Sequence, residues 1–164
     1  MPSKPIEHTL GDALRAANKT IAAAESCTGG LVGHLITNAA GSSDYFIGGL
    51  TTYAYHAKVR QLGVHWETLD THGAVSAETV LEMAAGVRAA METDIGISVS
   101  GIAGPGGGSP EKPVGLVWLG LDAPDGSWTR RHDFEGEREA VKQQAAQAAL
   151  QFVLDYLDGG LAGG

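Results

Sequence analysis

The chain has 164 residues, a net charge of −8 and 18% charged residues, which fits a single domain with a full hydrophobic core. The acidic charge and the lack of basic runs exclude direct binding of nucleic acid, since a phosphate backbone requires clustered Lys and Arg. The single cysteine, Cys27, indicates a reducing compartment, and no apolar run reaches the roughly 20 residues that span a bilayer. We therefore expect a cytoplasmic protein without membrane contact, and the low share of charge indicates a homo-oligomer.

The first half of the chain alternates helical and strand patterns around a polar turn at residues 25–30. Apolar residues at helical spacing predict a helix over residues 7–18, and a short apolar run predicts a buried strand at Thr20–Ala24. The helix after the turn carries four apolar residues on one face: Val32, Leu35, Ile36 and Ala39. The remaining predictions in this half are a loop, a strand rich in β-formers and a short helix, at residues 41–44, 45–55 and 56–62.

The second half begins with a long helix that Ser76 caps, with Glu78 in its first turn. This helix buries a row of apolar side chains: Val80, Met83, Ala84, Val87 and Met91. The uncharged segment Ile95–Ala103 is typical of a strand covered on both faces. The later predictions are a Gly/Pro loop, a strand, a hairpin turn, a second strand and a last helix, at residues 104–113, 114–121, 125–126, 128–134 and 141–156.

Strands that alternate with helices and then lead into a hairpin predict an α/β fold. We expect a three-layer α/β/α sandwich with a mixed, mostly parallel sheet. No internal repeat or linker interrupts the pattern. The sequence therefore predicts one domain over residues 1–158, followed by a flexible Gly-rich tail over residues 159–164.

Ser26 lies in the predicted strand-to-helix turn, where a hydroxyl can project beside the first amides of the helix. Such amides can hold a developing oxyanion, and those of Thr28, Gly29 and Gly30 would be sterically accessible. In the alternative interpretation, Ser26 or Thr28 only caps the helix. Cys27 is a rival nucleophile, because thiolates at helix N-termini are activated.

A serine nucleophile needs a base, and the six histidines are scattered without triad or metal-ligand spacing, so no metal site is predicted. Lys58 closes a segment of low charge that begins at Tyr53. Burial would lower the pKa of Lys58 from about 10.4 towards the range of a general base. Tyr53 would donate or relay protons to the same hydroxyl. In the alternative interpretation, Lys58 is a solvated lysine on a helix and Tyr53 is a tyrosine of the core.

The Gly104–Ser109 loop is rich in glycine, but it has the spacing of neither a Rossmann fingerprint nor a P-loop. It is either a phosphate-binding loop or a mobile connection between strands. The sequence by itself leaves these two interpretations open.

Five motifs resemble the CinA C-terminal domain family, whose single-domain members are nicotinamide-nucleotide amidases. They occur in the family's order and spacing, within roughly residues 10–157. The five motifs are residues 24–30 (AESCTGG), 41–43 (GSS), 73–76 (GAVS), 100–105 (SGIAGP) and 112–115 (KPVG). Together they make a chance resemblance very improbable.

The resemblance implies a three-layer α/β sandwich and hydrolysis of nicotinamide mononucleotide to nicotinate mononucleotide and ammonia, a salvage reaction that uses no cofactor. It implies Ser26 as nucleophile and Lys58, five residues after Tyr53, as its base. The expected substrate-binding residues all lie in the shared motifs: Glu25, Cys27, Thr28, Gly29, Gly30, Ser42, Gly101 and Gly104. The resemblance leaves phosphate recognition unassigned, and the Gly104–Ser109 loop, Arg130 and Arg131 are our candidates for it.

The chain also departs from this pattern. Many relatives carry Tyr-x-Asn-x-x-Lys, and Tyr55 stands here in place of the Asn. The larger N-terminal domain of full-length members is not part of the sequence, so we expect none of its activities. The alternatives to the amidase are a non-catalytic nucleotide-binding or regulatory protein, an interaction protein in DNA uptake or repair, and an amidase for another small amide.

Overall fold

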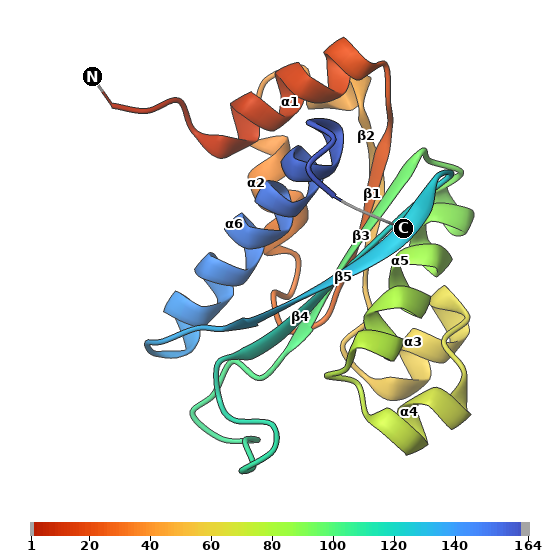
Figure 1. Cartoon of the computed structure of the whole chain (residues 1–164), viewed down its shortest axis with the longest axis vertical. Helices are drawn as coiled ribbons and strands as arrows, with labels where there is room; N and C mark the ends of the chain where they lie inside the picture. Colours follow the sequence, from red (N-terminus) through yellow and green to blue (C-terminus); the bar gives the residue numbers. More distant parts are fainter. Residues whose placement is uncertain (1, 162–164) are drawn as a thin grey trace.

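The computed structural model describes residues 2–161 (Figure 1). Within this range, helices of two kinds surround one five-stranded sheet. The helices are α1 (Ile6–Ala17), α2 (Leu31–Thr37), the 3-10 helix η1 (Ser42–Asp44), α3 (Tyr55–Leu62), α4 (Trp66–His72), α5 (Ala77–Met91) and α6 (Arg138–Leu157). The strands are β1 (Ile21–Glu25), β2 (Phe46–Thr51), β3 (Ile95–Gly101), β4 (Leu116–Ala123) and β5 (Gly126–Asp133).

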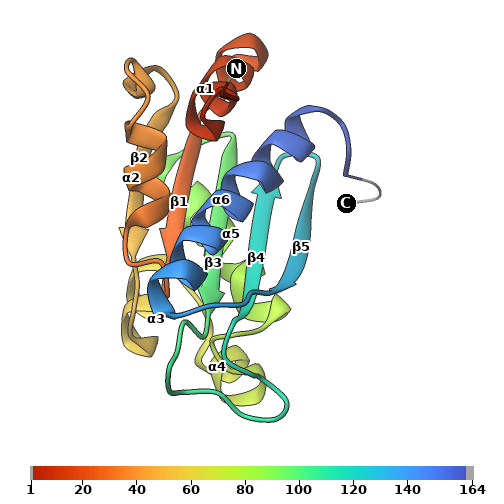
Figure 2. The ribbon, with the colours of Figure 1, turned by 90° about the vertical axis from the view of Figure 1, so that its left-hand side faces the viewer.

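The elements form three layers, with α1, α2 and α6 on one face of the sheet and α3, α4 and α5 on the other (Figure 1). The strand order is β2-β1-β3-β4-β5. Strand β1 pairs in parallel with β2 and β3, and β4 pairs antiparallel with β3 and β5. The predicted α/β/α sandwich with a mixed sheet is therefore confirmed, and only β4 opposes the direction of the other four strands (Figure 2).

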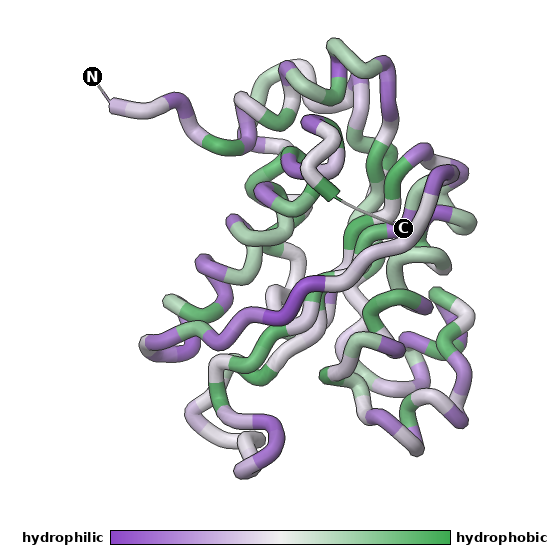
Figure 3. Tube along the Cα trace, viewed as in Figure 1, coloured by the Kyte–Doolittle hydropathy of each residue, from purple (hydrophilic) through white to green (hydrophobic). Residues whose placement is uncertain are grey.

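Strand β1 carries the hydrophobic core on both of its faces. Ile21 and Ala23 pack in the cluster beneath α1, α2 and α6, whereas Ala22 and Ala24 pack in the cluster beneath α5. This follows from the alternation of side chains along a strand that is covered on both sides. At the sheet's edge, β5 carries a hydrophilic stretch instead (Figure 3), and charges on an edge strand discourage pairing with other chains.

The N-cap of α5 was predicted correctly, and the β4–β5 hairpin was predicted with its turn one position too late. Ser76 caps α5 by accepting a hydrogen bond from the Thr79 amide at 3.2 Å. The hairpin turn falls on Pro124 and Asp125, one position before the predicted dipeptide. Both features are local, so the sequence signal for each survives in the fold.

Other boundaries differ from the predictions. The strand expected at residues 45–55 ends at Thr51, because Tyr55 already begins α3. Helix α4 was not predicted; it has seven residues and buries only Leu69, which leaves little apolar periodicity to detect. Part of the expected loop at residues 41–44 is the 3-10 helix η1.

The end of the chain bears partly on the predicted Gly-rich tail. The amides of Gly159 and Gly160 donate to the carbonyls of Tyr156 and Asp155 and so close α6. Residues 162–164 of the predicted tail lie outside the described residues. Over residues 2–161, each helix is too short or too polar to cross a membrane.

Candidate active site

The candidate site lies at the carboxyl ends of the parallel strands β1, β2 and β3 (Figure 2). Ligands of open α/β sheets bind at the carboxyl ends of the strands, because loops and helix starts converge there. A cavity of about 270 Å³ opens at this end of the sheet. Its lining includes Ser26, Cys27, Tyr53, Tyr55, Lys58, Ala74, Val75, Ser100, Gly101, Ala103 and Arg138.

Ser26 and Lys58 meet in this cavity. The Lys58 side chain is fully buried, and its Nζ lies 2.9 Å from the Ser26 Oγ. The same amine donates to the carbonyls of Thr52 at 2.6 Å and Tyr53 at 3.1 Å. A neutral amine has two hydrogens and one lone pair. With both hydrogens held by these carbonyls, its lone pair is left for the hydroxyl proton of Ser26.

Burial shifts the pKa values of two groups beside Ser26, the Lys58 amine and the Cys27 thiol, in opposite directions. It lowers the pKa of Lys58 to about 8, because a buried ammonium loses its hydration. Burial raises the pKa of the Cys27 thiol to about 11, so the thiol stays protonated at neutral pH. The neutral, proton-accepting form of Lys58 is thus populated as the pH approaches 8, whereas the thiol is still protonated there and is not prepared to attack.

Glu25, which was expected to bind substrate, stabilises the turn after β1 and does not line the cavity. Its buried carboxylate accepts hydrogen bonds from the Thr28 hydroxyl at 2.6 Å and from the amides of Gly30, Val32 and Gly33 at 3.2, 2.8 and 3.0 Å. These donors lie in the turn before α2 and in its first turn, and the N-cap Gly30 supplies no side-chain bond. The carboxylate therefore performs the capping that Gly30 cannot.

Alternation along β1 explains why Glu25 and Ser26 point to opposite faces of the sheet. Glu25 continues the row of Ile21 and Ala23 towards α2, and Ser26 continues the row of Ala22 and Ala24 towards α3, which carries Lys58. The Ser26 amide also donates to the Val99 carbonyl at 3.0 Å, so the backbone of Ser26 is tied to β3.

The amides of the turn are not equally available. The Gly29 amide donates to the Ser26 carbonyl at 3.0 Å, and the Gly30 amide donates to Glu25. The amides of Cys27 and Thr28 donate to no group among residues 2–161. Two of the three amides expected to hold an oxyanion, those of Gly29 and Gly30, are thus already hydrogen-bonded. The free amide donors of the turn are those of Cys27 and Thr28. Both glycines have positive φ angles, 63° and 111°, which the tight turn requires.

Tyr53 and Arg138 form the rim of the cavity. Tyr53 is 61% exposed, and its hydroxyl accepts a hydrogen bond from the Arg138 guanidinium at 3.0 Å. Arg138 also donates to the Gly104 carbonyl at 2.6 Å. The guanidinium thereby joins the segments that follow β2 and β3. No motif in the sequence had pointed to Arg138, which comes from the start of α6.

Strand β3 supplies the floor of the cavity. Ser100 and Gly101 both line it, and a side chain at Gly101 would stand only 2.6 Å from Val117. Ser100 was in a quoted motif but was not selected from the sequence. Its side chain lies on the same strand face as that of Ser98, whose hydroxyl donates to the Val80 carbonyl in α5 at 2.6 Å. Strand alternation could therefore have predicted which face of β3 carries Ser100.

Ser42 does not join the other expected residues. It lies in η1, before the start of β2, whereas Ser26 lies beyond the end of β1, which runs parallel to β2. Ser42 and Ser26 therefore lie at opposite ends of the strands. Arg15 holds the loop by donating to the Gly41 carbonyl at 3.0 Å.

The two phosphate candidates of the hairpin also lie elsewhere. Arg130 is paired with Asp155 at 2.7 Å and stacks over Phe152. Arg131 is paired with Asp133 at 3.2 Å and lines a separate hollow beside α5. Neither side chain lines the cavity of Ser26.

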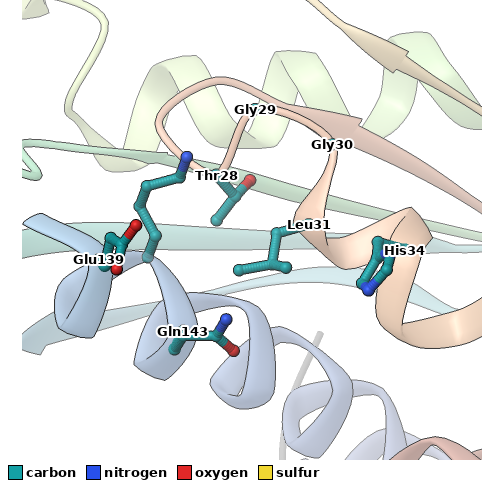
Figure 4. Close-up of a pocket in the computed structure, with 8 residues that line it drawn as sticks. Thr28, Gly29, Gly30, Leu31, His34, Glu139 and Gln143 are labelled. Carbon is teal, nitrogen blue, oxygen red and sulfur yellow. The ribbon is translucent and has the colours of Figure 1, made fainter.

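A second hollow, of about 470 Å³, lies behind the turn, between α2 and α6. Figure 4 shows Thr28 and Leu31 facing Glu139 and Gln143, with His34 at one side. It contains neither Ser26 nor Lys58. Thr28, Gly29 and Gly30 line this hollow and not the cavity of Ser26.

Within residues 2–161, no three His, Cys, Asp or Glu side chains come together as a set that could hold a metal ion. The groups available for chemistry in the Ser26 cavity are two hydroxyls, two phenols, a thiol, an amine and a guanidinium, from Ser26, Ser100, Tyr53, Tyr55, Cys27, Lys58 and Arg138. This set suits acyl transfer through a serine nucleophile with a lysine base.

Comparison with known proteins places the chain among relatives of several lengths. It is 50% identical over 147 residues to the nicotinamide-nucleotide amidohydrolase PncC of Escherichia coli K12, covering 89% of both proteins. It is also 50% identical over 146 residues to a CinA-like protein of Salinibacter ruber, of which it spans 35%. The chain thus covers about a third of the length of the first curated relatives that it matches.

Solved structures and a family model agree with these relatives. A CinA superfamily protein from Klebsiella pneumoniae superposes with a TM-score of 0.91 at 34% identity, over 94% of this chain and 96% of that one. The model of the CinA C-terminal domain matches residues 3–157. The chain belongs to the CinA C-terminal domain family.

Proposed function

We propose that this protein is a nicotinamide-nucleotide amidase that hydrolyses nicotinamide mononucleotide to nicotinate mononucleotide and ammonia. The observation that carries the proposal is the 2.9 Å contact between the buried Lys58 amine and the Ser26 hydroxyl. The 50% identity to a nicotinamide-nucleotide amidohydrolase, over 89% of both chains, supports this substrate.

In the proposed first step, neutral Lys58 takes the proton of the Ser26 hydroxyl as the oxygen attacks the carboxamide carbon. The carbonyl oxygen becomes an oxyanion, which the free amide of Cys27 stabilises, because Cys27 lines the cavity. Each such donor is worth about 3 kcal/mol in comparable sites. The positively charged pyridinium ring withdraws electrons and makes this carboxamide more electrophilic than a neutral aromatic amide.

The intermediate then collapses as the C–N bond breaks. The ammonium of Lys58 returns its proton to the departing nitrogen, which leaves as ammonia. Tyr53, whose hydroxyl Arg138 holds at the rim, is the alternative donor of this single proton. Water next attacks the acyl-serine and gives one proton to Lys58, which passes it to the Ser26 oxygen as nicotinate mononucleotide leaves.

We assign the phosphate to Arg138 rather than to Arg130 or Arg131. The Ser26 cavity adjoins a hollow of about 460 Å³, and Arg138 and Ala103 line both spaces. The ring and carboxamide would occupy the first space, and the ribose phosphate would extend into the second. Gly136 and Glu137 place that hollow at the start of the 20-residue helix α6, where the helix dipole favours an anion.

Glu25, Gly29 and Gly30 act in this proposal as positioning residues for the turn. Gly101 allows β3 to pack closely against Val117, and the Gly104 carbonyl fixes the Arg138 guanidinium. Ser42 has no role in this proposed site within one chain.

We further propose that the protein is a cytoplasmic homo-oligomer. Ile47, 51% exposed on the edge strand β2, supports a contact with a second copy. Sedimentation equilibrium tests this directly, and a monomer at all concentrations would contradict it.

The function is tested by incubating the chelator-treated protein with nicotinamide mononucleotide and measuring ammonia, beside a Ser26→Ala variant. We expect ammonia from the wild type alone. If the folded wild type releases none, the proposed substrate is wrong. Equal release from both proteins would instead remove Ser26 as nucleophile.

A further inference from the structure

Tyr55 is an exposed aromatic side chain within the cavity of Ser26. It is the first residue of α3 and lies one helical turn before Lys58, so both side chains share one side of the helix. Tyr55 is 43% exposed. Its hydroxyl accepts a long hydrogen bond, 3.4 Å, from the Ala74 amide. The ring is thus held at its hydroxyl end, and much of its surface remains open.

The charges of the cavity leave a cationic ligand without an ionic partner. The charged side chains among its lining residues are Lys58 and Arg138, both basic. The described lining residues include no Asp or Glu. A pyridinium ring therefore has only dipoles and aromatic faces to meet its positive charge there.

The two tyrosines of the cavity differ in their suitability for that task. The Tyr53 hydroxyl is bonded to the Arg138 guanidinium, a fixed cation that competes for the electrons of that residue. The Tyr55 hydroxyl receives only a backbone amide. Tyr55 is therefore the ring with the more favourable electrostatic surroundings for a second cation.

We propose that Tyr55 determines specificity by presenting its ring face to the positively charged pyridinium of the substrate. The inference rests on the proposed function and adds the physical basis of its selectivity. A cation over an aromatic face is attracted by the ring quadrupole. The site thereby prefers cationic N-substituted pyridinium carboxamides to neutral amides of the same shape.

Two nucleotides form a matched pair for the test: nicotinamide mononucleotide, with a cationic ring, and its reduced dihydro form, with a neutral one. Their dissociation constants are measured by calorimetry at pH 8 in a Ser26→Ala background, where no turnover occurs. We expect the cationic nucleotide to bind more tightly, by roughly 3- to 30-fold. This ratio, rather than either affinity alone, reports the contribution of the charge.

The ratio is then compared among variants made in the same background. Tyr55→Phe keeps the ring face and should retain the ratio, whereas Tyr55→Asn should bring it close to one. Trp66→Asn removes another exposed aromatic, from α4 outside the cavity, and should leave the ratio unchanged. Thermal unfolding of each variant checks its fold, and Tyr55→Phe tests the proposal even if Tyr55→Asn does not fold.

Three results would overturn the inference. A ratio independent of residue 55 would remove Tyr55 as the determinant. Loss of the ratio in Tyr55→Phe would assign it to the hydroxyl contact with Ala74. A change of oligomeric state in Tyr55→Asn with the ratio intact would make the exposed ring a subunit contact.

Failure of the proposed function has a different signature. In that case the wild type releases no ammonia from nicotinamide mononucleotide, whether or not the nucleotides bind the Ser26→Ala protein. If the inference about Tyr55 alone is wrong, both nucleotides bind and the wild type turns over. Turnover by the wild type thus separates the two failures.

Discussion

The Nζ of Lys58 lies 2.9 Å from the Oγ of Ser26, although 32 positions separate the two residues in the chain. The strand β2 brings them together, because it pairs with β1 and then leads into α3. The carbonyls of Thr52 and Tyr53, at the end of β2, hold the amine in place. The serine hydroxyl and the lysine amine are thus positioned by the pairing of two parallel strands.

Lys58→Met should abolish the release of ammonia while the protein stays folded. The methionine keeps the apolar volume but removes the base, which is worth about 10²- to 10⁴-fold in rate. Steady-state kinetics and circular dichroism measure both consequences. Lys19→Met is the matched control, because Lys19 precedes β1 at the far edge of the sheet. Substantial turnover by Lys58→Met would eliminate the Ser–Lys mechanism.

The pH dependence of kcat/KM should follow the deprotonation of Lys58. Only the neutral amine can accept the serine proton, and burial lowers the pKa of Lys58 to about 8. The rate should therefore rise with pH below about 8 and level off above it, with the slope of a single group. A profile that is flat between pH 6 and 9 would contradict this assignment.

The same pKa shift should appear in stability. The folded protein releases the Lys58 proton near pH 8, whereas the unfolded chain holds it until about 10.4. Because the unfolded state binds more protons in this window, the wild type should gain stability relative to Lys58→Met as pH rises from about 8 to about 10. The full shift corresponds to about 3 kcal/mol. Urea unfolding of both proteins at several pH values measures it, and a pH-independent difference would refute it.

Glu25→Gln should weaken both the fold and the rate. The carboxylate accepts four hydrogen bonds from the start of α2, and the amide nitrogen of Gln cannot accept. We expect a loss of about 1–3 kcal/mol in the free energy of unfolding. A misplaced turn should also lower kcat, by up to about 10²-fold.

A matched control for this change is Glu82→Gln. Glu82 also accepts from a backbone amide and a hydroxyl, those of His65 and Thr68, but outside the cavity. It should lose stability while keeping kcat. If both variants lose kcat equally, the effect on the rate is not specific to the turn.

Arg138→Met should remove the advantage that the phosphate gives to the substrate. Charge-assisted hydrogen bonds are worth about 1.5–3 kcal/mol, so kcat/KM for nicotinamide mononucleotide should fall roughly 10- to 100-fold. The value for nicotinamide riboside, which lacks the phosphate, should change less. Arg131→Met, outside the cavity, serves as control. An equal fall for both substrates would show that Arg138 does not recognise the phosphate.

Several features were determined by the sequence itself, because their causes are local. The lack of charge in β3 predicted that both faces of this strand are buried. Ser76 predicted the start of α5, and a turn dipeptide predicted the β4–β5 hairpin. The motif order was equally visible, and it led to the family before any geometry was known. Helix α4 escaped because one buried residue makes no periodic signal.

The site itself was decided by tertiary structure. Arg138 reaches Tyr53 from 85 positions away, and Ser42 is separated from Ser26 although both lie in shared motifs. Spacing along the chain does not determine at which end of the sheet a loop lies, since that depends on strand order and strand direction. The lowered pKa of Lys58 likewise exists only because packing removes its water. The sequence named the reactive side chains, and long-range pairing and burial decided which of them meet and in which protonation state.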